Sequence, residues 1–221
     1  MKEKKIAAYF DFDGTIYNGI VAYDVLKFAF FNRMMKISEA VSLSKLIYYY
    51  ALDKFNLADR HWINDKMYQK VRGWNSAKLE KASEEFFRLN IKNKLFKDVA
   101  EIIKWHVKNK HKIIVITSAL REMVNPARKF IKIDEIISTE VETKNDVYTG
   151  KIKSLPIGET RINIIKKHSI KNGIELGKSY AYSDHYSDIP MLENLGNAIA
   201  VHPDRRLKKH ALLMGWKIID H

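Results

Sequence analysis

The sequence predicts an α/β protein built on a parallel sheet with helices on both faces, and with an all-helical insertion after the first strand. Two observations lead to this fold class. Short apolar runs that end in polar residues alternate with segments of helical periodicity, as in successive strand–helix–strand units. Between the first run and the second lies a long stretch, residues 20–90, with helical periodicity only. Ligands of such sheets bind beyond the carboxyl ends of the strands, so the residues after each run are candidate site residues.

The first strand is predicted at residues 7–10, a short apolar run of the kind that is buried on both faces of a sheet. It ends in Asp11 and Asp13, which lie on one face of an extended strand end and therefore converge. Two such carboxylates need a cation or a shared proton between them, and Mg²⁺ with oxygen ligands is the simplest candidate. Gly14 permits the tight turn that follows. One carboxylate would then serve as a nucleophile or as an acid and base.

A calcium-binding loop and a plain turn are the alternatives for this motif. A calcium loop needs a Glu at its twelfth position, which counted from Asp11 is Ala22, so that alternative fails. A plain turn is not expected directly after a buried strand near the N-terminus. The motif therefore favours a catalytic role.

Helices are expected throughout the insertion. Ser38 is a candidate cap, and the face that contains Ile63, Met67 and Val71 ends at Gly73. The expected helices cover residues 21–32, 38–52, 63–73 and 79–89. We expect the insertion, residues 18–90, to form a helical domain of its own, and residues 1–17 with 91–221 to form the α/β core domain.

The remaining residues return to alternating strands and helices. Strands are expected at residues 112–118, 135–138, 179–183 and 198–201, a hairpin at 146–153 around Thr149-Gly150, and helices at 99–107, 122–130 and 163–171. Polar chemistry follows two of these strands, as Thr117 and Ser118 and as Asp184 and Asp188. Four carboxylates at one sheet edge require a metal ion.

Composition narrows the classes of function. The net charge of +13 indicates either an anionic partner or a solvated, lysine-rich surface, and without an arginine-rich arm a nucleic-acid module is not favoured. The absence of cysteine excludes disulfides and thiolate metal sites and is compatible with a reducing cytosol. The first apolar run is too short for a signal peptide, and no run reaches the ~18 apolar residues of a membrane span. We therefore expect a cytoplasmic protein with at most weak attraction to a membrane surface; the oligomeric state is open.

These motifs resemble those of the haloacid dehalogenase superfamily of phosphohydrolases, which has a Rossmann-like core. The resemblance is to the subfamily with a helical cap after the first strand, which includes the phosphoserine phosphatases, and it spans nearly the whole chain. The first motif is met by Asp11, Asp13 and Thr15, the second by Ser118 before Ala119 with Thr117 as the less suitable choice, and the fourth by Asp184 and Asp188.

The chain departs from the family pattern at the third motif. A lysine usually follows a glycine there, whereas Arg161 follows Gly158 in this chain. Arginine keeps the positive charge and adds bidentate phosphate contacts. Lys151 and Lys153 lie nearby in sequence and are the alternative cations.

A second departure concerns the substrate. Phosphoserine phosphatases carry an acidic residue soon after the first motif to hold the substrate amine. Residues 18–21 offer none, and Asp24 comes late. This difference argues against phosphoserine itself.

The resemblance implies Mg²⁺-dependent hydrolysis of a small phosphorylated metabolite through an aspartyl-phosphate. Asp11 would be the nucleophile and Asp13 the acid and base, while Ser118 and Arg161 hold the phosphoryl oxygens. Gly14, Thr15 and Ala119 would complete the phosphate site, and Asp11, Asp13, Asp184 and Asp188 the metal site. The aromatic, basic insertion is compatible with a lipid-derived or other amphipathic substrate. Alternatives are a phosphoserine phosphatase, a phospho-accepting signalling domain, and a protein that binds anionic ligands at an inactive site.

Overall fold

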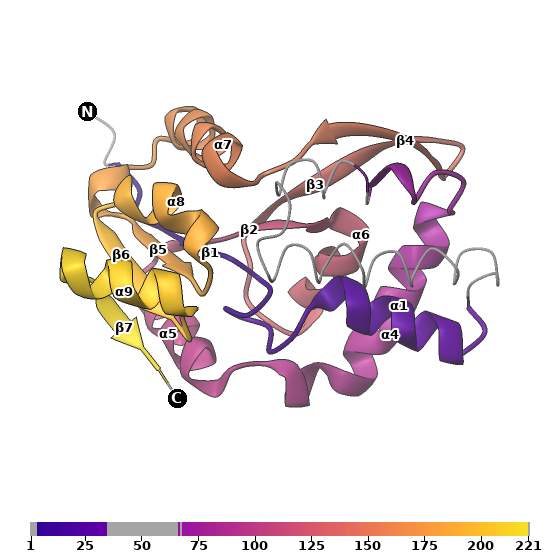
Figure 1. Cartoon of the computed structure of the whole chain (residues 1–221), viewed down its shortest axis with the longest axis horizontal. Helices are drawn as coiled ribbons and strands as arrows, with labels where there is room; N and C mark the ends of the chain where they lie inside the picture. Colours follow the sequence, from indigo (N-terminus) through magenta and orange to yellow (C-terminus); the bar gives the residue numbers. More distant parts are fainter. Residues whose placement is uncertain (1–3, 35–65, 67, 221) are drawn as a thin grey trace.

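The computed structural model describes residues 4–34, 66 and 68–220 (Figure 1). Its strands form one seven-stranded sheet in the order β4-β3-β2-β1-β5-β6-β7. Every neighbouring pair is parallel except β3 and β4, which are antiparallel. The α/β fold class is confirmed. The strands are β1 (Ala7–Phe10), β2 (Lys112–Leu120), β3 (Glu135–Lys144), β4 (Val147–Ser154), β5 (Tyr180–Ser183), β6 (Asn197–Val201) and β7 (Lys217–Ile219).

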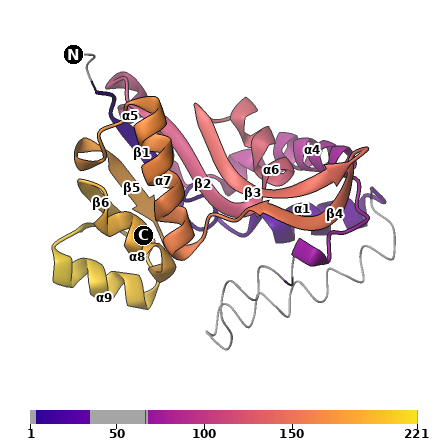
Figure 2. The same ribbon diagram turned by 90° about the horizontal axis from the view of Figure 1, so that it is seen from above.

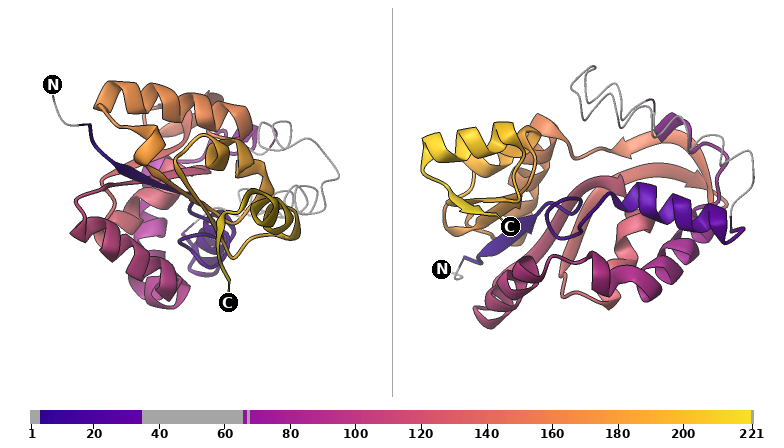
Figure 3. Two further views of the ribbon diagram at one scale, coloured as in Figure 1. Left: turned by 90° about the vertical axis from the view of Figure 1, so that its left-hand side faces the viewer. Right: turned by 60° about the horizontal axis from the view of Figure 1, so that its bottom comes forward.

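Helices cover both faces of the sheet, and Figure 3 shows α5 and α7 on opposite sides of the strands. None of the described helices is long and apolar enough to cross a bilayer. The α-helices are α1 (Val21–Phe31), α4 (Ser76–Lys94), α5 (Lys97–Lys108), α6 (Arg121–Val124), α7 (Gly158–Asn172), α8 (Ile189–Glu193) and α9 (Arg205–Met214). Short 3₁₀ helices span Asn125–Lys129, Leu176–Lys178 and Tyr186–Asp188.

The core is divided by the sheet into two layers. Along β1 the side chains alternate, so that Phe10 packs in the layer under α1, α4 and α5, whereas Tyr9 packs in the layer under α7, α8 and α9. All four residues of β1 are fully buried. The strand that precedes the candidate catalytic residues is therefore fully enclosed by the rest of the protein.

Within the insertion, α1 and α4 pack side by side (Figures 1 and 3), with the rings of Phe28 and Phe86 5.7 Å apart. Helix α4 also packs against α6 and against the 3₁₀ helix that follows α6, whose Lys129 pairs with Glu84 at 2.7 Å. Helix α4 continues to Lys94, so the expected domain boundary after residue 90 falls inside a helix. The helix expected at 38–52 lies outside the described residues, as do residues 63–65 and 67 of the one expected at 63–73. In the described part of that segment, residues 66, 68 and 69 are helical and residues 70–73 form a turn.

The hairpin differs in detail from the expectation. Its turn lies at Asn145 and Asp146, both with positive φ, rather than at Thr149-Gly150, which lie inside β4. The hairpin extends beyond the rest of the sheet toward the segment that precedes α4, as Figure 2 also shows. The helix expected at 122–130 is divided into α6 and a 3₁₀ helix, because Pro126 lacks the N–H that would continue an α-helix.

Candidate active site

The first motif follows β1 as a tight turn. The N–H of Asp11 donates to the carbonyl of Tyr182 on β5, and the carbonyl of Phe12 accepts the N–H groups of Thr15, Ile16 and Tyr17. Gly14 has φ +78°, and a Cβ there would lie 2.1 Å from Oδ2 of Asp184. Only glycine therefore allows the first motif to approach the acidic residue after β5 so closely.

Arg161 lies at the centre of the site. It enters from the first turn of α7 and is 2% exposed. Its Nη1 is 3.1 Å from Oδ1 of Asp11 and 2.5 Å from Oδ2 of Asp188, and its Nε donates to the carbonyl of Pro156 at 3.0 Å. Burial lowers the pKa of Arg161, but Asp188 and Asp11 outweigh that effect and hold the pKa above its usual value. A buried, permanent positive charge thus joins the first and fourth motifs.

The other two cations considered for the third motif lie elsewhere. Lys151 and Lys153 are exposed on β4, and neither forms an ion pair with the acidic residues of the site. The geometry therefore favours Arg161 over both lysines as the cation of the third motif.

The fourth motif is buried with the first. Oδ2 of Asp188 also accepts a hydrogen bond from the hydroxyl of Ser183 at 2.6 Å. Asp184 accepts one from the hydroxyl of Thr15 at 3.2 Å. Burial raises the pKa of Asp184 well above its usual value, and the negative charges of Asp11 and Asp188 raise it further.

The charges of this cluster fit a divalent cation. Asp11, Asp184 and Asp188 carry three negative charges in the ionised state, and Arg161 supplies one positive charge. The remaining donors are oxygens, which Mg²⁺ prefers. No three acidic or imidazole side chains in the described part of the chain form a ready-made set of ligands for one ion. A metal here would therefore need main-chain, water or substrate oxygens besides two carboxylates.

Asp13 is joined to the helical insertion. Its Oδ1 accepts the N–H of Val21, the first residue of α1, at 2.7 Å. Asp24, one turn later, is already bound: Oδ2 accepts the hydroxyl of Tyr17 at 2.6 Å and pairs with Nζ of Lys94 at 2.9 Å. Asp24 is the acidic residue of the insertion that is nearest in sequence to the first motif. Its charge is therefore already compensated by a lysine of the same protein.

The second motif lies at an irregularity of β2. Ser118 is half-buried, and its carbonyl accepts hydrogen bonds from the hydroxyls of Thr139 on β3, at 2.7 Å, and of Tyr68. Thr117 is buried, and its hydroxyl accepts the N–H of Ala119. Ser118 thus has the more accessible side chain. Asp13 and Ser118 lie at the same sheet edge as the Arg161 cluster.

Two residues of the site were missed by the sequence interpretation. Ser183 supports Asp188, as described above. Asp204 holds the loop that carries both acidic residues: its N–H donates to the carbonyl of Asp184, and its Oδ2 accepts the N–H of Tyr186, both at 2.7 Å. Its position after Pro203, behind the last apolar run, was the available signal.

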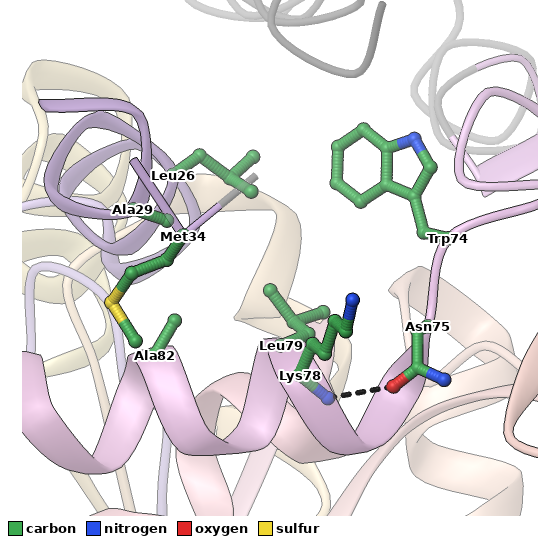
Figure 4. A pocket seen from close by; sticks show the side chains of 8 residues that line it. All are labelled: Leu26, Ala29, Met34, Trp74, Asn75, Lys78, Leu79 and Ala82. Atoms are coloured by element: carbon green, nitrogen blue, oxygen red, sulfur yellow. Dashed lines mark hydrogen bonds between the residues drawn. The ribbon is translucent and has the colours of Figure 1, made fainter. Parts of the chain in front are cut away.

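Two hollows lie away from this cluster. One, between α1, α4 and Trp74 (Figure 4), holds only about 30 Å³, room for a water molecule rather than a metabolite. The other, about 520 Å³, lies between α5 and strands β5 to β7 and is lined by rings that include Trp105 and Trp216. Neither is lined by residues of the Arg161 cluster, so neither extends the site.

The fold and the site place clustered aspartates at the carboxyl edge of a mostly parallel α/β sheet, the edge at which such folds bind their ligands. The chain belongs to the haloacid dehalogenase-like hydrolases, since the model of that family matches residues 8–193.

Relatives and solved structures agree with this assignment. The chain is 30% identical, over 67% of its length, to an inhibition of morphological differentiation protein of Streptomyces azureus, and spans about half of that protein, 54%. It is 27% identical to a phosphoserine phosphatase of Mycobacterium tuberculosis, covering 97% of this chain and 70% of that protein. The fold is shared with a Bordetella pertussis protein of unknown function (TM-score 0.83, 24% identity, 99% of both chains). It is also shared with a substrate-bound phosphoserine phosphatase (TM-score 0.72, 19% identity, 100% of this chain and 95% of that one).

Proposed function

We propose that this protein is a Mg²⁺-dependent phosphomonoester hydrolase that forms a phosphoryl intermediate on Asp11. The observation that carries the proposal is the buried bridge from Arg161 to Asp11 and Asp188. It brings a permanent positive charge to the carboxylate at which a phosphoryl group would be transferred. Relatives named probable phosphatase and phosphoserine phosphatase support the same reaction class.

In the first step a carboxylate oxygen of Asp11 attacks phosphorus, and the bond from phosphorus to the leaving oxygen breaks. Asp13 gives its proton to that oxygen. Oδ1 of Asp13 accepts the N–H of Val21 at 2.7 Å. The hydrogen bond fixes the acid relative to the start of α1.

In the second step Asp13 takes a proton from water, which attacks the phosphorus and releases Asp11 and phosphate. Negative charge moves over the phosphoryl oxygens in both steps. Arg161 and Ser118 are expected to stabilise that charge, with Thr15, Gly14 and Ala119 completing the phosphate site.

The donor set fits Mg²⁺, which Asp11, Asp184 and the main-chain carbonyl of Asp13 would hold. When bound, it would supply charge neutralisation to the phosphoryl group. Asp188 is bound to Arg161 and Ser183, so its role in this proposal is to orient the site. A metal site with two carboxylates and one main-chain carbonyl is consistent with the described residues, in which no three acidic or imidazole side chains form a metal cluster.

The insertion is the part of the chain that we expect to choose the substrate. We assign residues 18–94, up to the end of α4, to a helical cap, and residues 1–17 and 95–221 to the catalytic core. Groups of the core contact the phosphoryl group that all monoesters share, so discrimination must come from groups near the leaving group.

Phosphoserine is a second candidate substrate, because one relative is named a phosphoserine phosphatase. The state of Asp24 argues against it. Lys94 and Tyr17 already bind this carboxylate, so it offers no unpaired charge to a substrate amine. We favour a small monoester with a neutral or partly apolar leaving group.

A screen of phosphorylated metabolites tests the proposal. The purified protein should release phosphate with Mg²⁺, lose this activity in EDTA, and regain it when Mg²⁺ is restored. Full activity after exhaustive chelation would contradict the metal dependence. A stable phosphorylated protein without turnover would instead favour a phospho-accepting signalling domain.

A further inference from the structure

The carbonyl of Ser118 accepts hydroxyl groups from two distant parts of the chain. Thr139 donates from the neighbouring strand β3 at 2.7 Å, and Tyr68 donates from the segment that precedes α4. Tyr68 is buried, at 4% exposure, and Thr139 fully so. Both donor side chains are therefore buried, and a carbonyl that loses its partner in such surroundings is costly.

The carbonyl is available because the ladder between β2 and β3 is interrupted at this point. Ile116 is opposite Ile137, but the next pair is Leu120 with Thr139. Between these two pairs β2 therefore has more residues than β3. Such an irregularity re-aims side chains and removes backbone groups from the ladder. The orientation of the Ser118 peptide therefore depends on Thr139 and Tyr68 rather than on strand pairing.

The segment after Tyr68 is fixed to the core by backbone hydrogen bonds. The N–H of Gly73 donates to the carbonyl of Tyr148, and the N–H of Tyr148 donates to the carbonyl of Trp74, at 2.9 and 3.0 Å. The N–H of Ser76 donates to the carbonyl of Asp146 at the hairpin turn. The hairpin β3–β4 therefore holds the segment that follows Tyr68.

We propose that Tyr68 is a positioning residue for the phosphate site. By holding the carbonyl of Ser118, it orients the hydroxyl of the second motif toward the phosphoryl oxygens. Phosphate affinity thereby depends on the docking of the helical insertion. The inference rests on the proposed function, in which Ser118 binds the phosphoryl group.

Tyr68→Phe tests the inference, because it removes only the hydroxyl that reaches Ser118. The probe is inorganic phosphate, which has no leaving group to contact the insertion. Its affinity is measured with Mg²⁺ both by calorimetry and by competitive inhibition of p-nitrophenyl phosphate hydrolysis. Phosphate binding should weaken about three- to tenfold, the effect of losing one hydrogen bond.

Tyr148→Phe is the matched control. It removes another buried tyrosine hydroxyl at the same junction, one that lies near Glu122 and Tyr68 and has no hydrogen bond to Ser118 in the described part of the chain. Phosphate affinity should stay within about twofold, as for a change outside the site. Thermal unfolding of both variants separates a loss of folding from a loss of positioning.

Thr139 supplies an independent variant. Thr139→Val should weaken phosphate binding like Tyr68→Phe, and Thr139→Ser, which keeps the hydroxyl, should restore it. If Tyr68→Phe leaves phosphate affinity unchanged and alters only the KM of larger esters, Tyr68 contacts the leaving group and the inference is wrong. Phosphate binding that depends on Tyr68, in a protein without turnover, would overturn the proposed function alone. Turnover with phosphate binding independent of Tyr68 would overturn the inference alone.

Discussion

Arg161, at the start of α7, lies with its guanidinium 3.1 Å from the carboxylate of Asp11, after the central strand. The same nitrogen is 2.5 Å from Asp188. One buried cation therefore compensates two carboxylates from different motifs. Arginine suits this position because its guanidinium can bind several oxygens and stays charged when buried.

Arg161→Ala should lower kcat by about 100-fold or more, because it removes charge stabilisation at the phosphoryl group. Lys151→Ala and Lys153→Ala are the controls, since both lysines are exposed on β4, and their kcat should stay within about twofold of the parent. Steady-state kinetics with p-nitrophenyl phosphate provides the comparison. A lysine variant more damaging than the arginine variant would assign the third motif to that lysine.

Phosphoserine should be a poor substrate, with a kcat/KM about tenfold or more below that of a monoester with a neutral leaving group, because a buried ammonium without a partner is costly. Lys94→Met should narrow this difference, since it frees the carboxylate of Asp24 from its 2.9 Å ion pair. The measurement is kcat/KM for both esters with both proteins. Preference of the parent protein for phosphoserine would refute this interpretation of residues 18–24.

The sequence was most informative where a chemical group and its local pattern coincide. Asp11 and Asp184 each follow an apolar run, so their place at the sheet edge could be predicted from strand geometry alone. The roles of Tyr68 and Thr139 could not, because their hydroxyls act through tertiary contacts that have no local signature.

The predicted position of the hairpin turn was wrong, again because a tertiary contact decides the role of the residue concerned. Gly150 resembles a turn residue, and it does adopt a positive φ of 85°. It lies inside β4, however, where a Cβ would be 3.2 Å from Cβ of Arg72. Glycine is used there for close packing against the segment before α4, which local sequence cannot distinguish from a turn.

The stability of the protein should fall in mild acid because of His106. Nε2 of His106 forms a hydrogen bond with the hydroxyl of Tyr182, and Nδ1 of His106 forms one with Nδ1 of His111. Burial, with a smaller effect of His111, lowers the pKa of His106 from 6.5 to about 4. Between these values the unfolded chain binds more protons than the folded one. The free energy of unfolding should therefore fall as the pH falls from 6.5 to 4, by about 1–3 kcal/mol.

Urea unfolding of the parent and of His106→Asn across this pH range measures the effect. The variant should show a smaller loss of stability in acid, whereas the surface control His210→Asn should keep the full loss. Equal pH dependence of all three proteins would exclude His106 as the cause.

Asp204 should contribute to both folding and metal affinity. Its Oδ1 accepts the N–H groups of Arg206 and Leu207 at the start of α9, while its Oδ2 holds the loop that carries Asp184. Asp204→Ala should lower the free energy of unfolding by about 1–2 kcal/mol, the value of a helix cap. It should also raise the Mg²⁺ concentration needed for half-maximal turnover. Asp204→Asn, a good cap, should retain most of the stability, and unchanged metal dependence in both variants would limit Asp204 to capping.

The central claim is that Asp11 is the nucleophile, and Asp11→Asn tests it most directly, because the amide keeps the shape of the side chain and removes the attacking carboxylate. The measurement is kcat for p-nitrophenyl phosphate at saturating Mg²⁺, with circular dichroism to confirm that the variant is folded. We predict a loss of about 10⁴-fold or more, the scale observed when a covalent nucleophile is removed. A folded variant whose kcat stays within about tenfold of the parent would contradict a phosphoryl intermediate on Asp11.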